Sequence, residues 1–200
     1  MTRPATEPDA SELAGYSVIV GICGGIAAYK VASLVSALVQ RGAEVTVAMT
    51  AAAQKFITPL TFESLTARQV YTDLWHAENH HDPQHLNLTR KADVFVVAPA
   101  TANMIGKMAC GLADDLVSTM VMSAACPILL CPAMNTLMWE NPIVQKNLES
   151  LRGHGYQVMP PGEGWLACRT IGAGRLPEPQ DILSVVVSML KQSAPKSASK

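Results

Sequence analysis

A glycine pair between a predicted strand and a predicted helix is the first candidate binding site. Gly24 and Gly25 follow the β-branched run 16–23 and precede a helical pattern, so backbone N–H groups there could hold a phosphate. The segment is not a GxGxxG motif, and no acidic residue closes the next strand near Thr50, where a ribose-binding carboxylate would stand. NAD is therefore disfavoured, whereas a mononucleotide phosphate remains possible. A tight turn without a ligand explains the glycines equally well.

Two further strand ends carry hydroxyl and amide groups. Thr101 and Asn103 stand at a predicted helix start, where ordinary N-capping is the simpler interpretation of this segment alone. Asn135, in the segment 132–139, stands between two methionines and near a tryptophan. An amide can donate to and accept from a carboxylate ligand, although Met and Trp side chains usually only fill space.

Cys168 stands in the Gly/Pro-rich segment 160–179, which is predicted as a long loop. Loops of this length in compact domains are usually functional or disordered, and the glycines could serve as hinges of a lid. The charge of the neighbouring Arg169 would favour the thiolate of Cys168. We therefore favour a lid with a functional thiol over a flexible surface loop with an inert one.

Four histidines lie close together in the sequence, at His76, His80, His81 and His85. Their spacing fits no standard zinc pattern, and Pro83 breaks any helix in this stretch, so no metal site is expected. A single catalytic histidine is the better interpretation, because its pKa lies near neutrality. For a histidine chosen blindly, a solvated surface role is commoner still.

Strand and helix patterns alternate along the chain and would position these groups. Strands are predicted over 16–23, 44–49, 93–98, 128–131 and 157–159, with a weak one over 69–71; helices are predicted over 26–41, 51–57, 60–65, 86–91, 101–108, 114–125, 142–153 and 179–192. This alternation predicts a parallel sheet with helices on both faces, where ligands bind at the carboxyl ends of the strands. We expect one domain over 15–192, between disordered tails at 1–14 and 193–200.

Composition excludes several classes of protein. The 200 residues are 49% hydrophobic and 16% charged with a net charge of -1, which excludes bulk disorder and disfavours duplex nucleic acid as a partner. Five cysteines without a CxxC pair disfavour disulfides and favour a reducing, cytoplasmic compartment. The uncharged run 116–134 contains two prolines and is better explained as helix, turn and strand than as a membrane span. The low charge content indicates that self-association hides apolar surface.

Taken together, these segments resemble the homo-oligomeric flavin-containing cysteine decarboxylases. Each motif is weak alone, but their joint order and spacing over residues 16–190 is highly specific. The motifs are Gly24-Gly25-Ile26-Ala27-Ala28-Tyr29-Lys30, His85-Leu86, Pro99-Ala100-Thr101-Ala102-Asn103, Gly111-Leu112-Ala113-Asp114-Asp115, Pro132-Ala133-Met134-Asn135 with Met138-Trp139, and Ala167-Cys168-Arg169 leading to Gly174-Arg175-Leu176-Pro177-Glu178-Pro179. The resemblance implies a Rossmann-like, flavodoxin-type three-layer α/β sandwich and FMN as cofactor.

The resemblance also implies roles for particular residues. FMN would contact Gly25, Ile26, Thr50, Pro99, Thr101, Ala102 and Asn103. His85 would be the catalytic base, Asn135 would hold the substrate carboxylate, and Cys168 would donate a proton in the final reduction. Met134, Ala167 and Arg169 would complete the substrate site.

The implied activity is that of a carboxy-lyase of coenzyme A biosynthesis. It converts 4′-phospho-N-pantothenoylcysteine to 4′-phosphopantetheine by thiol oxidation, loss of CO2 and re-reduction, with FMN carrying the redox chemistry. Members of the family form trimers, some assembled into dodecamers, with FMN at a subunit interface. Bacterial relatives often carry a second domain that ligates cysteine to phosphopantothenate, and this chain is too short to hold it, so we expect a separate ligase.

Two alternatives remain. A peptide C-terminal cysteine decarboxylase would share the chemistry, and a non-catalytic FMN-binding regulatory subunit would share the fold. The joint presence of His85, Asn135 and Cys168 argues against the second alternative.

Overall fold

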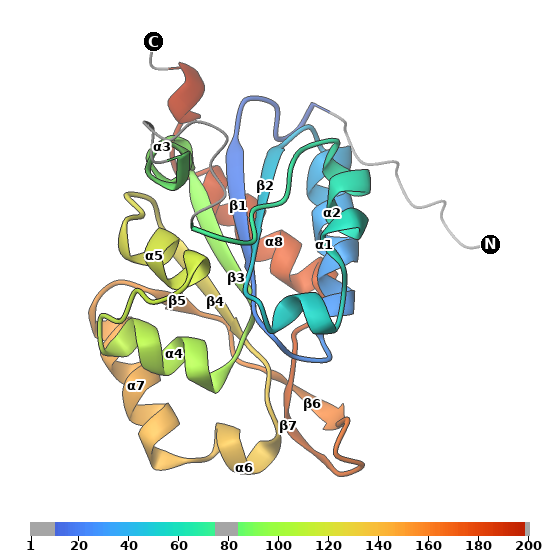
Figure 1. The fold of residues 1–200 in the computed structure, drawn as a ribbon, viewed down its shortest axis with the longest axis vertical. Coiled ribbons are helices and arrows are strands. Elements are labelled where there is room, and N and C mark those ends of the chain that lie inside the picture. Colours follow the sequence, from blue (N-terminus) through green and yellow to red (C-terminus); the bar gives the residue numbers. More distant parts are fainter. Residues whose placement is uncertain (1–10, 75–83, 199–200) are drawn as a thin grey trace, which may run out of the picture.

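A five-stranded parallel sheet forms the centre of the protein. The structure, a computed structural model, describes residues 11–74 and 84–198 (Figure 1). The strands are β1 (Ser17–Ile22), β2 (Glu44–Met49), β3 (Val94–Ala100), β4 (Ile128–Pro132) and β5 (Gln157–Val158), in the order β2-β1-β3-β4-β5. β1 and β3 are the central pair, and Val18 is aligned with Val45 on one side and with Val94 on the other. In such an order the chain changes direction between β1 and β3, and the crevice at their carboxyl ends is where ligands bind.

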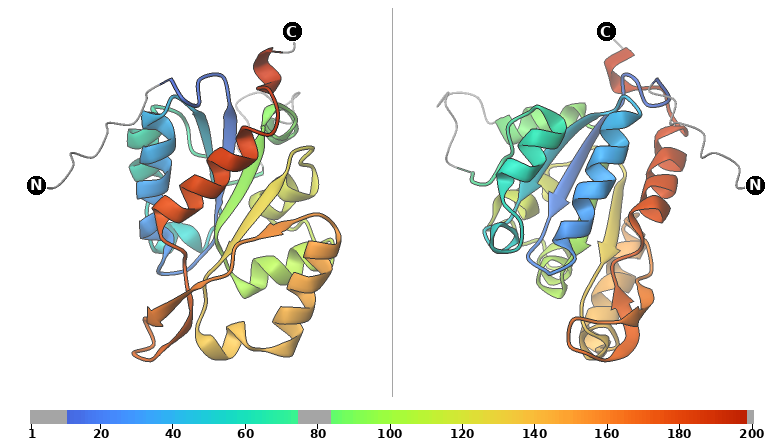
Figure 2. Two further views of the ribbon diagram at one scale, coloured as in Figure 1. Left: turned by 180° about the vertical axis from the view of Figure 1, so that it is seen from behind. Right: turned by 90° about the vertical axis from the view of Figure 1, so that its right-hand side faces the viewer.

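Helices cover both faces of the sheet, which gives three layers (Figure 2). One face is covered by α1 (Ala28–Gln40) and α8 (Pro179–Leu190), with α2 (Pro59–Thr66) packed against α1; the other is covered by α4 (Ala102–Ala109), α5 (Leu116–Met122) and α7 (Pro142–Gly153), with α3 (Gln84–Lys91) packed against α5. Short elements are η1 (Ala53–Lys55), α6 (Thr136–Trp139) and η2 (Lys196–Ala198). The predicted three-layer α/β fold is confirmed.

The central strands are buried because apolar residues occupy both of their faces. All seven residues of β3 are buried, as expected for a parallel strand covered on both sides. In α1 the buried residues Val31, Leu34, Val35 and Leu38 follow the helical period and face the sheet. The chain turns back after α1 at Gly42, whose φ of +88° favours glycine.

The predicted loop over 160–179 is wrong. Residues Gly162–Trp165 (β6) and Ile171–Arg175 (β7) pair as an antiparallel hairpin that extends below the sheet (Figure 1). The strand pattern is hidden because six of the nine strand residues are glycine or charged, which are poor strand formers. The short helix α6 was also not predicted, and the weak strand over 69–71 is reduced to a bridge between Ala48 and Tyr71.

Parts of both predicted tails are packed on the sheet. Leu13 is fully buried, and its N–H donates to the Arg41 carbonyl at 2.8 Å. At the other end, the Lys196 ammonium donates to the Ala92 carbonyl at 2.7 Å, and the Ser197 hydroxyl donates to the Gly15 carbonyl at 2.7 Å. The predicted disorder therefore does not hold for residues 11–14 and 193–198, because tertiary hydrogen bonds order a polar sequence that has no pattern of its own.

Among the described residues, none of the helices combines the length and the apolar character that crossing a bilayer requires. All five cysteines are free thiols. No group of three or more His, Cys, Asp or Glu side chains in the described ranges is arranged to hold a metal ion. His76, His80 and His81 lie outside these ranges.

Candidate active site

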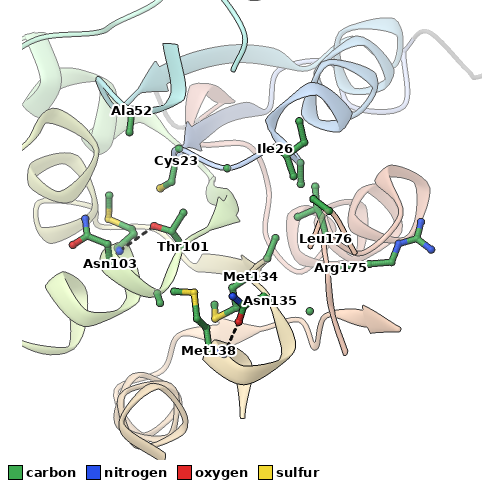
Figure 3. Close-up of a pocket in the computed structure, with 18 of the residues that line it drawn as sticks. Cys23, Ile26, Ala52, Thr101, Asn103, Met134, Asn135, Met138, Arg175 and Leu176 are labelled. Atoms are coloured by element: carbon green, nitrogen blue, oxygen red, sulfur yellow. Dashed lines mark hydrogen bonds between the residues drawn. The ribbon is translucent and has the colours of Figure 1, made fainter. Parts of the chain in front are cut away.

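A cavity of about 760 Å³ lies at the carboxyl ends of the central strands (Figure 3). Its walls come from the turns after β1, β2, β3 and β4 and from the β6–β7 hairpin. This volume is within the range of small-molecule and cofactor sites, about 300–1,000 Å³. The position is the one that the parallel-sheet rule predicts from the sequence.

Main-chain N–H groups line one side of this cavity and form a cradle over residues 24–27 and 101–103. The N–H groups of residues 24–27 and of Ala102 and Asn103 have no acceptor among the described residues. The Thr101 hydroxyl accepts from the Met104 N–H at 3.2 Å and caps α4, which leaves the hydroxyl proton available to a ligand. Two converging sets of unpaired N–H groups at helix starts form a site for an anion such as a phosphate.

The close packing of the β1–α1 turn determines the floor of the cradle. A Cβ on Gly24 would overlap Ala52, and it would come within 2.9 Å of the Ala52 carbonyl carbon, so only glycine fits there. A Cβ on Gly25 would meet only Pro99, at 3.8 Å. Cys23 lines the same floor, and burial raises the pKa of its thiol to about 12, so it stays protonated and non-nucleophilic near neutral pH.

Asn135 stands on the opposite wall, at the start of α6 (Figure 3). Its side-chain oxygen accepts from the Met138 N–H at 2.8 Å and caps this short helix. The amide NH2 group is therefore the part of Asn135 left for a ligand, and an N–H donor is what a carboxylate requires. The segment that follows the buried strand β4 thus presents an amide donor to the cavity.

Two main-chain carbonyls of β7 dock the β6–β7 hairpin against the Asn135 turn. The Met134 N–H donates to the Gly174 carbonyl at 2.9 Å, and the Thr136 hydroxyl donates to the Ala173 carbonyl at 2.9 Å. A Cβ on Gly174 would overlap the Met134 carbonyl oxygen, and the φ of +136° at Gly174 is itself suited only to glycine. The base of the hairpin is thus fixed to the wall of the cavity.

The tip of the hairpin presents Cys168. The turn closes with the Leu166 N–H donating to the Thr170 carbonyl at 2.8 Å, and Arg169 adopts a left-handed φ of +65°. The Cys168 thiol is exposed, lines the cavity and lies 3.1 Å from the Thr170 hydroxyl. An accessible thiol and the amide of Asn135 therefore share one cavity with the N–H cradle.

Most of the predicted site residues come together in this cavity. Its lining includes Gly25, Ile26, Thr50, Thr101, Ala102, Asn103, Met134, Asn135, Ala167 and Cys168. Pro99 is buried behind the cradle and Arg169 lies outside the lining, so the structure does not bring either of them to the cavity.

His85 is the exception among the predicted catalytic residues. It belongs to α3, which packs against α5 and directly precedes β3, so α3 lies at the amino end of that strand (Figure 1). The cavity lies at the carboxyl ends, where β3 is followed by Thr101. The structure does not place α3 at the cavity of its own chain, and the His85 side chain is outside the part of the protein that the structure describes.

Four charged residues of the lining were not predicted as site residues: Lys30, Lys107, Asp115 and Arg175. For Lys30 a signal was present, because it lies four residues after Ile26 and hence on the same face of α1. Asp115 and Lys107 meet only because α4 and α5 pack together, which no local pattern shows.

The fold and the site define a class of protein: a doubly wound parallel α/β protein with a cavity at the central strand ends, lined by unpaired main-chain N–H groups, an amide and a thiol. The profile of the flavoprotein family matches residues 6–191. The chain belongs to this family.

Similar proteins include the coenzyme A biosynthesis bifunctional protein CoaBC of Bacillus subtilis, 44% identical over 169 residues, which are 84% of this chain and 42% of that protein. The chain therefore spans less than half the length of this relative. A cysteine-to-serine mutant of PPC decarboxylase complexed with pantothenoylaminoethenethiol superimposes with a TM-score of 0.79 and 33% identity, over 89% of this chain and 99% of that one. The FMN-dependent cysteine decarboxylase SpaF superimposes with a TM-score of 0.76 and 31% identity, over 92% of this chain and 98% of that chain.

Proposed function

We propose that the protein is an FMN-dependent phosphopantothenoylcysteine decarboxylase, which converts 4′-phospho-N-pantothenoylcysteine to 4′-phosphopantetheine. The observation that carries the proposal is the convergence of Asn135 and Cys168, from separate segments, on the cavity that contains the N–H cradle. The likeness to PPC decarboxylase over 99% of that chain and to a coenzyme A biosynthesis protein supports this substrate.

FMN fits the residues present. The cradle offers unpaired N–H groups for its phosphate, and the lining is mainly apolar around Ile26, Ala52 and Met134, as a flat ring system requires. Gly25, Thr50, Thr101 and Asn103 would hold the cofactor. When bound, FMN supplies reversible two-electron redox chemistry, which turns an ordinary cysteine carboxylate into one that can leave.

The remaining tasks fall to side chains of this chain. The Asn135 amide would donate to the substrate carboxylate and orient it for departure. Cys168 would deliver a proton to carbon after CO2 has left, from the hairpin tip where its thiol faces the cavity. The hairpin would cover the substrate and exclude water.

The assignment of His85 as the base requires a second copy of the chain. Because α3 lies at the far end of the sheet from the cavity, we infer a homo-oligomer, expected as a trimer or as a dodecamer built from trimers, in which a neighbour brings its α3 to this cavity. Large apolar side chains exposed around the cavity support such an interface, among them Ile26 in the turn before α1, Tyr29 on α1 and Leu137 on α6. We also expect a cytoplasmic location and a ligase activity that supplies the substrate.

Mass spectrometry of the substrate incubated with the purified, FMN-loaded protein tests the activity. We expect loss of CO2 with formation of 4′-phosphopantetheine, and Cys168→Ser should stop after decarboxylation with reduced flavin and an oxidised product. An intact substrate would overturn the proposal, and turnover of a peptide ending in cysteine instead would establish the alternative. Normal turnover by Cys168→Ser would exclude the proton-donor role.

Mixed oligomers test the shared site. His85→Asn and Cys168→Ser should each be inactive alone, whereas their co-expression should restore part of the activity, because some cavities then receive His85 from one chain and Cys168 from another. Mixtures that stay inactive, although the two chains co-purify, would exclude a site shared in this way.

A further inference from the structure

The basic side chains of the cavity divide into two clusters of opposite net charge. Lys107 donates to Asp114 at 2.6 Å and to Asp115 at 2.7 Å, so one ammonium faces two carboxylates. The pKa of Lys107 is raised by hydrogen bonds to these two carboxylates, and it stays charged near neutral pH. This acidic cluster carries a net charge of about -1 and repels a phosphate.

The second cluster, formed by Lys30, Arg175 and Glu178, has the reverse composition. The Lys30 ammonium lies 2.9 Å from Glu178 Oε1, and the Arg175 guanidinium lies 3.2 Å from the same oxygen. The pKa of Glu178 is lowered, first by its hydrogen bond with Lys30, so the carboxylate is ionised near neutral pH. Two cations then share one anion, and this basic cluster carries a net charge of about +1.

The two cations come from different elements and both line the cavity. Lys30 lies on α1, four residues after Ile26, and its side chain is only 18% exposed, so its charge is weakly screened by water. Arg175 ends β7, directly after the glycine that docks the hairpin on the Asn135 turn. Figure 3 shows Arg175 across the cavity from Asn103 and the start of α4. The basic cluster is therefore separate from the α4 part of the cradle.

We propose that Lys30 and Arg175 form a phosphate subsite that binds the phosphate of the substrate, at the end of its pantothenoyl arm remote from the cysteine. The proposal rests on the proposed function, because that substrate carries a phosphate of its own besides the phosphate of FMN. The unpaired N–H groups of the cradle serve the cofactor phosphate, which leaves the excess cation for a second phosphate. Glu178 holds the two cations apart and in place when no phosphate is bound. The subsite would select phosphorylated substrates over peptides that end in cysteine.

Paired substrates test this subsite directly. The FMN-loaded protein would be assayed with 4′-phospho-N-pantothenoylcysteine and with N-pantothenoylcysteine, which differ only in the phosphate. We expect Lys30→Met and Arg175→Met each to lower kcat/KM for the phosphorylated substrate about 10- to 100-fold and to leave the other substrate within a factor of two or three, as loss of a charge-assisted hydrogen bond predicts. Lys191→Met is the matched control, because it breaks a 2.7 Å pair with Glu12 away from the cavity.

Glu178→Gln separates a phosphate subsite from a merely structural ion pair. It keeps both cations and removes their anion, so the preference for the phosphorylated substrate should rise or stay unchanged. A structural role would make Glu178→Gln and Lys30→Met change both substrates in the same direction, and that result would overturn the proposal. Lys30→Arg should retain most of the preference.

Three further results decide whether the phosphate subsite exists when the variants alone do not. A wild-type protein that does not discriminate between the two substrates overturns the subsite. Weaker binding of FMN, but not of riboflavin, by Lys30→Met with an unchanged substrate preference assigns the cation to the cofactor phosphate and also overturns it. If neither substrate is decarboxylated, the proposed function fails, and calorimetry of the FMN-loaded protein with 4′-phosphopantetheine and pantetheine then decides the subsite: tighter binding of the phosphorylated compound supports it, and equal binding overturns it.

Discussion

The cradle and the hairpin wall face each other across one cavity, but they are built in different ways. The cradle consists of main-chain N–H groups at the ends of β1 and β3, and the strands behind it are buried on both faces. The hairpin wall, formed by the Asn135 turn and the β6–β7 hairpin, consists of side chains on exposed elements. Trp165 and Ile171, which flank the hairpin tip, are 63% and 79% exposed.

This difference separates two requirements of the proposed reaction. A cofactor that stays bound benefits from rigid donors held by the sheet, which main-chain groups at strand ends provide. A substrate that enters and leaves benefits from a wall attached through few contacts. Within the wall, the hairpin is joined to the Asn135 turn through the hydrogen bonds from Met134 and Thr136 to the Gly174 and Ala173 carbonyls. Substitutions in the wall should therefore affect turnover, and substitutions in the cradle should affect stability and cofactor binding.

Gly174→Ala should give the largest effect on turnover, because it should distort the hairpin wall and leave the cradle intact. The new Cβ would overlap the Met134 carbonyl oxygen, so the hairpin must shift and carry Cys168 with it. A misplacement of this size costs turnover on the order of 100-fold. Steady-state assays should show this loss while FMN content stays that of the wild type. Gly153→Ala, with nothing within 4 Å of its new Cβ, is the control and should be fully active. Loss of FMN from Gly174→Ala would mean that wall and cradle are not independent.

Gly24→Ala should break the cradle instead. The Cβ would overlap Ala52, and relief of the clash requires a backbone shift that costs about 1–3 kcal/mol of unfolding free energy. Urea denaturation should show this loss, and the affinity for FMN should fall with it. Gly25→Ala, whose Cβ has 3.8 Å to its nearest neighbour, should leave the unfolding free energy close to that of the wild type. Equal destabilisation by the two variants would contradict the packing argument.

Two helix N-cap residues allow the cradle and the hairpin wall to be compared directly. Thr101 caps α4 in the cradle and Asn135 caps the four-residue α6 in the wall. Thr101→Ala should lower the unfolding free energy by about 1 kcal/mol and weaken FMN binding, and Thr101→Ser should restore both. Asn135→Ala should lower turnover roughly 10-fold, as loss of a hydrogen bond to a charged group predicts. The loss of stability should be smaller than for Thr101→Ala, because α6 contains no buried residue. The reverse pattern, in which Asn135→Ala is the more destabilising variant, would count against the division of roles.

The smallest expected effect is a pH dependence at the base of the hairpin. Lys30 and then Arg175 lower the pKa of Glu178 below its ordinary value of 4.5. A carboxylate whose pKa is lower in the folded than in the unfolded state stabilises the fold above about pH 4.5, and this stabilisation is lost as the pH falls through the folded-state pKa. Thermal unfolding should be measured from pH 3 to 7. The Tm of the wild type should be slightly higher than that of Glu178→Gln at pH 7, and the two Tm values should be equal at pH 3. The effect is small because Glu178 is 57% exposed and screened by water. A Tm difference between the two proteins that grows as the pH falls would contradict this prediction.

The sequence predicted the sheet, its layers and the strand ends that meet at the cavity. The strand ends that carry Gly25, Thr101 and Asn135 were placed correctly because each belongs to a local pattern, a buried run followed by a helix start. In parallel sheets the carboxyl ends of the strands meet at one edge, so local patterns were enough to bring these residues together.

Three features were decided only by the tertiary structure. The hairpin forms because glycines allow Ala173 and Gly174 to dock on a turn nearly forty residues away, and its strands contain no alternating pattern that reveals them. The basic cluster joins Lys30 to Glu178, which are 148 residues apart. The position of α3, at the amino edge and away from the cavity, follows from its packing on α5 rather than from its own sequence. Local periodicity determines which elements form, but contacts between distant residues determine which side chains share a site, since those contacts exist only after the chain has folded.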